Sequence, residues 1–322
     1  MMFLPVILFI VGLALLIKGG GWFVDGATGI AHRFRIPELL IGATIVSAGT
    51  TLPEVMVSAA SALSGHGEIA YGNAIGSIIC NTALIAAITV AVRPPRVESA
   101  SLNVPVLFFF GAAALYAGVA YFAGEFTRLV GVALLAIFLA YMTYNVLQVR
   151  KLPHAETRGE PENGASRIWL DALRLVIGAA AVAFGADLLV DNGTLIAQTL
   201  GVPESVIALT FVALGTSLPE LVTAITALTK GHGALSLGNI IGANLFNLVL
   251  VSGISVVLSP FAVPTGKTIA GLNASLVLDI PLMLFVMAFL TIPALRRGKL
   301  ARWQGVTLLC VYGAFCLFQF FG

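Results

Sequence analysis

The chain has 322 residues, of which 59% are hydrophobic and only 10% are charged, and its formal net charge at pH 7 is +2. A mean hydropathy of +1.01 excludes a water-soluble globular protein, because such a domain has too little interior to bury that much apolar surface. The small net charge offers no basic surface for nucleic acid. We therefore expect the lipid bilayer as the main surroundings and no nucleic-acid partner.

Runs of about 20 apolar residues predict ten transmembrane helices and an all-α membrane protein. In chain order these runs cover residues 3–20, 38–64, 68–91, 102–122, 127–149, 168–189, 204–230, 234–258, 273–293 and 303–321. The first run lacks a basic start and a small-residue cleavage site, so we interpret it as a helix and not as a signal peptide. Residues 1–150 thus form one five-helix unit, residues 151–167 a polar linker, and residues 168–322 a second five-helix unit.

The second half repeats the first at a constant offset of 166 residues, and residues 36–82 share 18 identities in 47 positions with residues 202–248. The peptide from Gly49 to Glu54, GTTLPE, returns as GTSLPE from Gly215 to Glu220. Similarity at a fixed offset indicates an internal duplication. Five spans, an odd number, separate the two copies, so the second copy enters the membrane from the opposite side. The predicted repeats are therefore inverted.

The basic residues give an independent test of this topology. Of the 17 Lys and Arg residues, 14 fall on the side of the central linker, Arg128 and Lys267 fall on the other side, and Lys18 lies within the first span. Short cytoplasmic loops collect Lys and Arg. We therefore expect a multi-pass protein of the cell (plasma) membrane, with the linker inside and both termini outside.

Each copy of the hexapeptide places a proline and a carboxylate inside a span. Pro53 has no N–H for the carbonyl of Gly49, and Pro219 has none for that of Gly215, so helices 2 and 7 are predicted to break there. Irregular backbone at membrane depth persists only where it is buried in protein or lines a cavity, and intramembrane carboxylates are costly and usually functional. Two such breaks in corresponding positions predict a binding site where the repeats meet.

The side chains around the two breaks offer only oxygen atoms as ligands. They are the carboxylates of Glu54 and Glu220 and the hydroxyls of Thr50, Thr51, Thr216 and Ser217. The amide oxygens of Asn81 and Asn247, on the following helices, would extend this set, and Ser77 lies one turn before Asn81 on the same face. The counterpart of Ser77 is Ala243, which has no hydroxyl.

Oxygen ligands with two negative charges suit a hard divalent cation such as Ca²⁺, and the same oxygens could hold several Na⁺ ions. Mg²⁺ fits less well because it gives up its water reluctantly. Two kinds of ion that compete for shared carboxylates cannot occupy them together. This competition is a direct physical basis for ion exchange.

These motifs resemble the two alpha-repeats of the calcium/cation antiporter superfamily, whose best-known branch is the sodium/calcium exchangers. The resemblance implies that Glu54 and Glu220 are the central ligands, surrounded by the hydroxyls named above. It also implies ligand roles for the backbone carbonyls of Ser47 and Ala213 and for the side chains of Ser77, Asn81 and Asn247. We expect no cofactor, inorganic cations as the transported partners, and a monomer.

Four positions in these motifs bear on which ions the resemblance implies. Potassium-dependent relatives usually carry an aspartate at the position of Asn247, so the amide favours potassium independence. Ala243 departs from a serine that commonly helps to form a sodium site, which leaves the counter-ion open between Na⁺ and H⁺. Relatives that exchange Ca²⁺ for H⁺ generally have an acidic residue after the Gly-Asn pair, where Ala74 and Ile240 stand here, and this favours Na⁺.

The sequence therefore predicts an antiporter that exchanges Ca²⁺ for Na⁺ by alternating access, with spans 1 and 6 sliding across a core of spans 2, 3, 7 and 8. A Ca²⁺/H⁺ antiporter at the same site is the alternative. An ion channel and an intramembrane enzyme are more distant ones. The near-identical sequences around Glu54 and Glu220 argue against an enzyme, because an acid–base pair needs unlike surroundings.

Overall fold

The computed structural model describes residues 3–95, 99–151, 164–199, 215–266 and 268–321, and most of this backbone is helical. The helical segments of the first half are α1 (Phe3–Arg33), α2 (Glu38–Ile41), η1 (Gly42–Val46), α3 (Ser47–Thr50), α4 (Leu52–Leu63), α5 (Gly67–Cys80), η2 (Asn81–Ala86), α6 (Ala87–Val92), α7 (Ser99–Phe122) and α8 (Arg128–Lys151). Those of the second half are α9 (Gly164–Thr199), α11 (Leu218–Thr229), α12 (Gly233–Phe246), η4 (Asn247–Val251), α13 (Ser252–Leu258), η5 (Ser275–Asp279), α14 (Ile280–Arg297) and α15 (Arg302–Phe321). Segments labelled η are π-helical.

Four two-residue strands accompany the helices. Strand β1 (Glu125–Phe126) pairs antiparallel with β2 (Phe261–Ala262), and β3 (Thr268–Ile269) pairs antiparallel with β4 (Leu272–Asn273). The first pairing joins the connection between α7 and α8 to the connection that follows α13. It therefore ties the two halves of the chain together at one end of the helical bundle.

Seven helical runs in the described part of the chain are long and apolar enough to cross a membrane, and a bent pair makes an eighth. The bent pair consists of residues 38–50 and 52–63, whose axes meet at 45°. The expected seventh span covers residues 204–230. Its residues 204–214 lie outside the described part, and α11 (Leu218–Thr229) covers most of the remainder. The all-helical membrane fold agrees with the expectation, and the count of ten spans stays a prediction.

Two helices extend well beyond the apolar runs that predicted them. Helix α1 continues to Arg33 where the run ends near residue 20, and α9 covers 36 residues from Gly164 to Thr199. Hydropathy detects only the part of a helix that matches hydrocarbon, whereas polar residues at its end continue the helix in water or in ion pairs. Asp25 in α1 is such a residue, because its carboxylate accepts from Lys230 Nζ at 2.6 Å.

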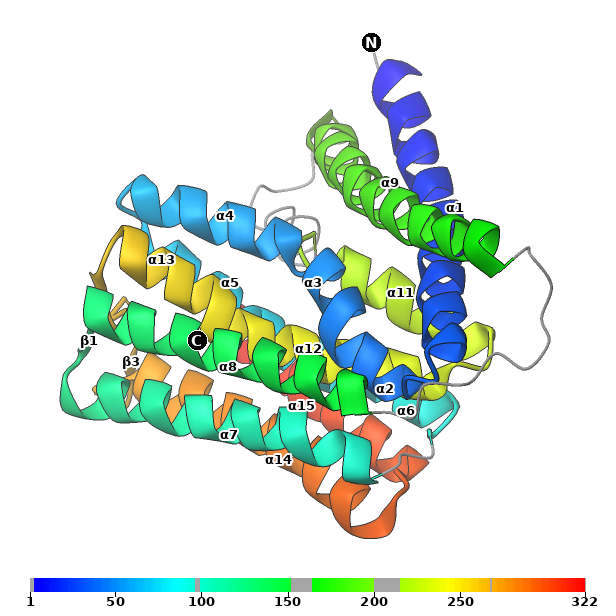
Figure 1. Ribbon diagram of the computed structural model, residues 1–322. Helices are drawn as coiled ribbons and strands as arrows, with labels where there is room; N and C mark the ends of the chain where they lie inside the picture. Colours follow the sequence, from blue (N-terminus) through cyan, green and yellow to red (C-terminus); the bar gives the residue numbers. More distant parts are fainter. Residues whose placement is uncertain (1–2, 96–98, 152–163, 200–214, 267, 322) are drawn as a thin grey trace.

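Helices α1 and α9 pack side by side next to the block formed by the other helices, which α1 contacts through α11 and α2 (Figure 1). Glycines bring their backbones together: a Cβ built on Gly12 would lie 2.8 Å from the Gly185 carbonyl oxygen, and one on Gly19 would lie 3.1 Å from that of Gly178. The offset of 166 residues converts the first pair into the second. The contact between α1 and α9 therefore has approximate two-fold symmetry.

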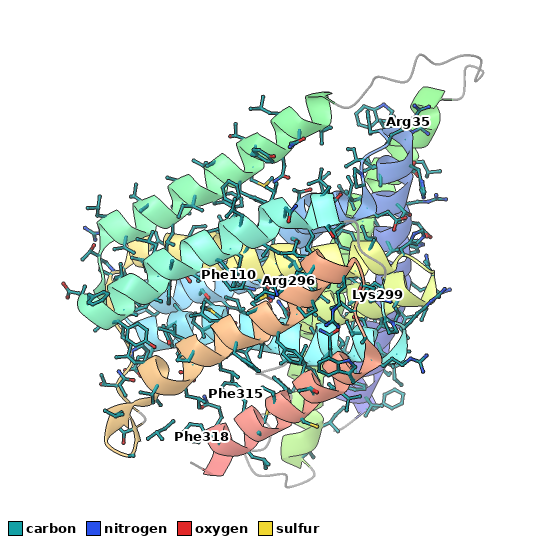
Figure 2. All side chains as sticks on the ribbon, turned by 90° about the horizontal axis from the view of Figure 1, so that it is seen from below. Arg35, Phe110, Arg296, Lys299, Phe315 and Phe318 are labelled. Atoms are coloured by element: carbon teal, nitrogen blue, oxygen red, sulfur yellow. The ribbon has the colours of Figure 1, made fainter. Side chains whose placement is uncertain are left out.

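The block of other helices has an aromatic and aliphatic interior. Tyr116, Phe126, Tyr141 and Phe246 are fully buried in it, and the rings of Tyr116 and Phe126 are 4.4 Å apart. The outer surface is also apolar, since Phe122 is 94% exposed and many other large apolar side chains project outward (Figure 2). An apolar surface around an apolar core is the pattern of a protein surrounded by lipid.

The glycine contact predicts that Gly185→Ala lowers the stability of the protein by about 1–3 kcal/mol, the usual effect of overpacking a tight contact. The new Cβ would lie 2.9 Å from the Gly12 carbonyl oxygen. Thermal unfolding in detergent measures the effect. Gly118→Ala on α7 is the matched control, because no atom lies within 4 Å of its Cβ position. Equal losses in the two variants would contradict the role assigned to the glycines.

Candidate functional site

The first hexapeptide lies at the bend between α3 and α4. The N–H of Thr51 still donates to the Ser47 carbonyl at 2.9 Å, but Pro53 has no N–H to continue the series. A new helix, α4, starts at Leu52 and carries Glu54 in its first turn. The proline therefore both breaks the span and places a carboxylate at the positive end of a short helix.

The second hexapeptide has the same arrangement. Residues 215–217 form a turn, α11 begins at Leu218, and Glu220 lies in its first turn. The expectation that Pro219 leaves the Gly215 carbonyl without a donor was wrong, because the Leu218 N–H donates to it at 3.2 Å. The turn closes one residue earlier than the proline, so the missing N–H of Pro219 leaves no gap there.

The two carboxylates are buried completely. Glu54 and Glu220 are each 0% exposed, and none of their four carboxylate oxygens has a hydrogen-bond partner among the described residues. The two groups lie close enough to interact electrostatically. Two like charges in a dry interior repel each other and have lost their hydration. The pair therefore needs positive charge from outside the protein.

Neutral oxygen atoms are also buried on the helices that carry this pair and on the segments packed against them, and several of these atoms have no described partner. Thr50, Thr51 and Ser217 are at most 3% exposed, Asn81 and Asn247 are 0% exposed, and the Thr51 hydroxyl and both asparagine amides have no hydrogen-bond partner among the described residues. Native proteins rarely leave buried polar atoms without partners. Carboxylate, hydroxyl and amide oxygens together fit a hard cation such as Ca²⁺ or Na⁺.

Hydrogen bonds between the repeats bring the two motifs face to face. The hydroxyl of Thr50 donates to Asn239 Oδ1 at 3.3 Å, and that of Thr216 donates to Asn73 Oδ1, also at 3.3 Å. Adding 166 to Thr50 gives Thr216, and adding 166 to Asn73 gives Asn239. The two bonds are therefore one contact repeated by an approximate two-fold axis that passes through the site.

The two asparagines named as ligand candidates mark a change of helix type. The α-helical backbone of α5 becomes π-helical at Asn81, and that of α12 becomes π-helical at Asn247. Single π-helical turns are frequent at functional sites. Segment η4 packs against α4, which carries Glu54, and η2 packs against α11, which carries Glu220. Each asparagine thus begins a segment that packs on a carboxylate-bearing helix of the opposite repeat.

The remaining candidates differ in how free their oxygens are. Ser77 is 5% exposed, and Thr216 is half-buried. The Ser47 carbonyl accepts from the Thr51 N–H at 2.9 Å and lies 3.4 Å from the Thr50 hydroxyl. Ala213 lies outside the described residues.

One further buried side chain, Cys80, lies close to the site. Its thiol lies beside the Ser217 hydroxyl and near the Glu220 carboxylate. Its neighbour Asn81 begins the π-helical segment η2, which packs against α11.

Sequence reasoning passed over several buried polar groups. The hydroxyls of Thr223 and Ser236 and the amide oxygen of Asn244 are buried without described partners. Their counterparts in the first copy are Val57, Ala70 and Ile78. Identities between the two copies do not mark polar residues that occur in only one copy. A search for polar residues inside apolar spans could have found them.

Comparison with known proteins shows the family of this chain. The family model described as sodium/calcium exchanger protein matches residues 4–147 and 171–321. A membrane protein of Methanocaldococcus jannaschii is 33% identical over 313 residues, which are 97% of each chain. The sodium/calcium exchanger MaX1 of Methanosarcina acetivorans is 28% identical over 360 aligned positions, covering 98% of each chain.

Solved structures agree as well. The sodium-calcium exchanger NCX_Mj, soaked with Na⁺ and Sr²⁺, has a TM-score of 0.81 against this protein at 30% identity, and the match covers 98% of each chain. The family consists of membrane transporters and not of enzymes. The chain is therefore a multi-pass integral membrane protein that belongs to the sodium/calcium exchanger family of calcium/cation antiporters.

Proposed function

We propose that this protein is a secondary-active antiporter that exchanges Ca²⁺ for Na⁺ at one site shared by Glu54 and Glu220. The observation that carries the proposal is the pair of fully buried carboxylates, one from each repeat, without described hydrogen-bond partners. The names of MaX1 and NCX_Mj, both sodium/calcium exchangers, support the same choice of ions. Structures of NCX_Mj soaked with Na⁺ and either Sr²⁺ or Ca²⁺ support it further.

The proposed ligands come from both repeats. They are Glu54, Glu220, Thr50, Thr51, Thr216, Ser217, Ser77, Asn81 and Asn247, with the backbone carbonyls of Ser47 and Ala213. Ca²⁺ takes about 6–8 oxygen ligands in flexible geometry, which this set can supply. The two carboxylate charges match one Ca²⁺, whereas Na⁺ ions would divide the same oxygens among them.

Charge neutralisation couples the two ions. An empty site would carry two buried like charges, which resist the dry intermediate that separates the inward-open and outward-open states. Either Ca²⁺ or Na⁺ removes this repulsion, but the shared carboxylates cannot hold both loads together. Only a loaded carrier therefore crosses, and each crossing moves one kind of ion.

The moving parts are the α1–α9 pair and the block that holds the site. The two parts approach each other closely: a Cβ on Gly49 would lie 3.0 Å from the ring of Phe23, and one on Gly20 would lie 2.7 Å from Val222. The close glycine contact between α1 and α9 favours their movement as one unit. Small residues at the contact with the block favour sliding over separation.

The proposal includes the full inverted plan of ten helices, with helices 2 and 7 broken at the core. Residues 1–150 and 168–322 are the two five-helix repeats, and residues 151–167 are the cytoplasmic linker. We place the protein in the plasma membrane as a monomer with both termini outside. Figure 2 shows Arg35 and Lys299 on the right-hand side of the molecule and Phe318 on the opposite side, an arrangement that supports one basic, cytoplasmic end.

A first prediction concerns the acids. Glu54→Gln or Glu220→Gln should lower Ca²⁺ flux by roughly 100-fold or more, because removal of one buried charge partner typically costs about 3–5 kcal/mol. Glutamine has the same shape, so the variants should fold. Flux of ⁴⁵Ca²⁺ into proteoliposomes measures the effect, with the exposed acid variant Glu68→Gln as control. Wild-type flux in either site variant would remove Glu54 and Glu220 from the proposal.

A second prediction concerns the driving gradient. An imposed Na⁺ gradient should drive ⁴⁵Ca²⁺ accumulation in proteoliposomes, and an imposed pH gradient should not. Accumulation driven by the pH gradient alone would establish the Ca²⁺/H⁺ antiporter instead. Full-rate Ca²⁺ flux with no counter-ion on the opposite side would indicate a channel, because coupled exchange requires a load in both directions.

A third prediction concerns the missing hydroxyl. Ala243→Ser should raise the apparent affinity for Na⁺ by about 5-fold, the effect of one added neutral ligand at about 1 kcal/mol. Ser77→Ala, the reverse change in the other copy, should lower it. The Na⁺ concentration that half-inhibits ⁴⁵Ca²⁺ binding measures both. Unchanged Na⁺ dependence in Ala243→Ser would show that this alanine does not limit sodium binding.

A further inference from the structure

The threonine hydroxyls of the site donate their hydrogens away from it. Thr216 donates to Asn73 Oδ1, and Thr50 donates to Asn239 Oδ1, both at 3.3 Å. A hydroxyl has one hydrogen and two lone pairs. When an outside amide oxygen takes the hydrogen, only lone pairs remain for the interior of the site. Asn73 therefore makes Thr216 an acceptor-only ligand, which a cation requires.

The orientation of the Asn73 amide is fixed by its other contacts. Its Nδ2 donates to the Glu54 carbonyl at 3.2 Å and to the Ser58 hydroxyl at 2.8 Å. Because a carbonyl oxygen only accepts, the amide nitrogen must face Glu54, and Oδ1 must then face Thr216. Ser58 is 0% exposed, so water does not compete for this contact. Ser58, Asn73 and Thr216 form one chain of hydrogen bonds that ends in the site.

The second repeat lacks the first member of this chain. The residue 166 positions after Ser58 is Ala224, which is buried and has no hydroxyl. Accordingly, Asn239 Nδ2 is buried without a described partner. The Thr50 hydroxyl also has other acceptors, since the Ser47 carbonyl lies 3.4 Å away and the Glu220 carboxylate lies beside it. The Thr50 half of the site is therefore held less firmly than the Thr216 half.

We propose that Ser58 is a positioning residue for cation binding: through Asn73 it holds the Thr216 hydroxyl with its lone pairs toward the ion. The proposal rests on the proposed cation site, to which Thr216 belongs. Ala224 leaves the corresponding support absent around Thr50, so one half of the site is preorganised and the other half adapts. Preorganised ligands bind more tightly because less ordering is required on binding.

The charge of the ion makes this role measurable. The attraction between an ion and an oriented hydroxyl dipole is proportional to the charge of the ion. Loss of orientation at Thr216 therefore weakens Ca²⁺ binding about twice as much in free energy as Na⁺ binding at the same distance. A general loss of folding would instead reduce the number of binding sites for both ions equally.

Equilibrium binding of ⁴⁵Ca²⁺ to the purified full-length protein, with Na⁺ as competitor, tests the proposal. Ser58→Ala should raise the Kd for Ca²⁺ by about 5-fold, the usual effect of one lost neutral hydrogen bond, and the Kd for Na⁺ by about 2-fold. Ser58→Thr, which keeps the hydroxyl, should restore most of the wild-type affinity. Ala224→Ser should lower the Kd for Ca²⁺ by supplying the missing partner of Asn239.

The outcomes separate this proposal from the proposed function. Wild-type protein that binds no Ca²⁺ would overturn the cation site and, with it, the role of Ser58. Wild-type binding with an unchanged Ca²⁺/Na⁺ affinity ratio in Ser58→Ala would overturn the positioning role alone. If Ser58→Ala does not fold, as judged by thermal unfolding without ions, the Kd of Ala224→Ser for Ca²⁺ tests the proposal. An unchanged Kd for Ca²⁺ in that variant would then overturn the proposal.

Discussion

The burial of two like charges in one dry interior is the constraint on which the rest of the structure depends. Each of the two carboxylates, Glu54 and Glu220, lies in the first turn of a short helix, whose positive end stabilises an anion by at most about 2 kcal/mol. The effective desolvation penalty of a buried ion is several kcal/mol, before their mutual repulsion is added. The helix ends therefore do not compensate the pair when both acids are ionised, and in the proposed function a bound cation supplies the difference. The helix starts at Leu52 and Leu218 bring the two acids into the same interior.

Two-fold symmetry explains why neither repeat could form this site alone. The bonds from Thr50 to Asn239 and from Thr216 to Asn73 cross between the repeats, and η4 and η2 pack on the carboxylate-bearing helix of the other repeat. The α1–α9 pair has the same symmetry in its glycine contacts. The candidate site and the α1–α9 pair are thus each built from both halves, and in the proposed mechanism an inward-open state repeats the outward-open contacts with the halves exchanged.

The sequence predicted the features that depend on local pattern. Apolar runs located the seven spans and the bent pair that the described residues contain, and proline next to glutamate located the bend at Thr51. It could not predict contacts that depend on tertiary packing. The extension of α1 to Arg33 is accompanied by packing of Phe23 and Ala27 against other helices, and the bond from the Leu218 N–H to Gly215 depends on the shape of one turn. Neither the helix extension nor this hydrogen bond can be predicted from hydropathy or from the spacing of residues.

The differences between the copies bear more directly on ion choice than their similarities do. The carboxylates are the same in both repeats, so the charge that a load must supply is fixed at about two whichever ion binds. The neutral oxygens decide how many ions can share that charge, and here the second copy has alanine twice where the first has serine: Ala243 opposite Ser77 and Ala224 opposite Ser58. The alanine at position 243 removes a candidate ligand. The alanine at position 224 removes the hydroxyl that would hold an asparagine beside another candidate ligand. In the proposed site, fewer neutral oxygens limit how many Na⁺ ions can divide the two carboxylate charges, whereas one Ca²⁺ still matches both charges.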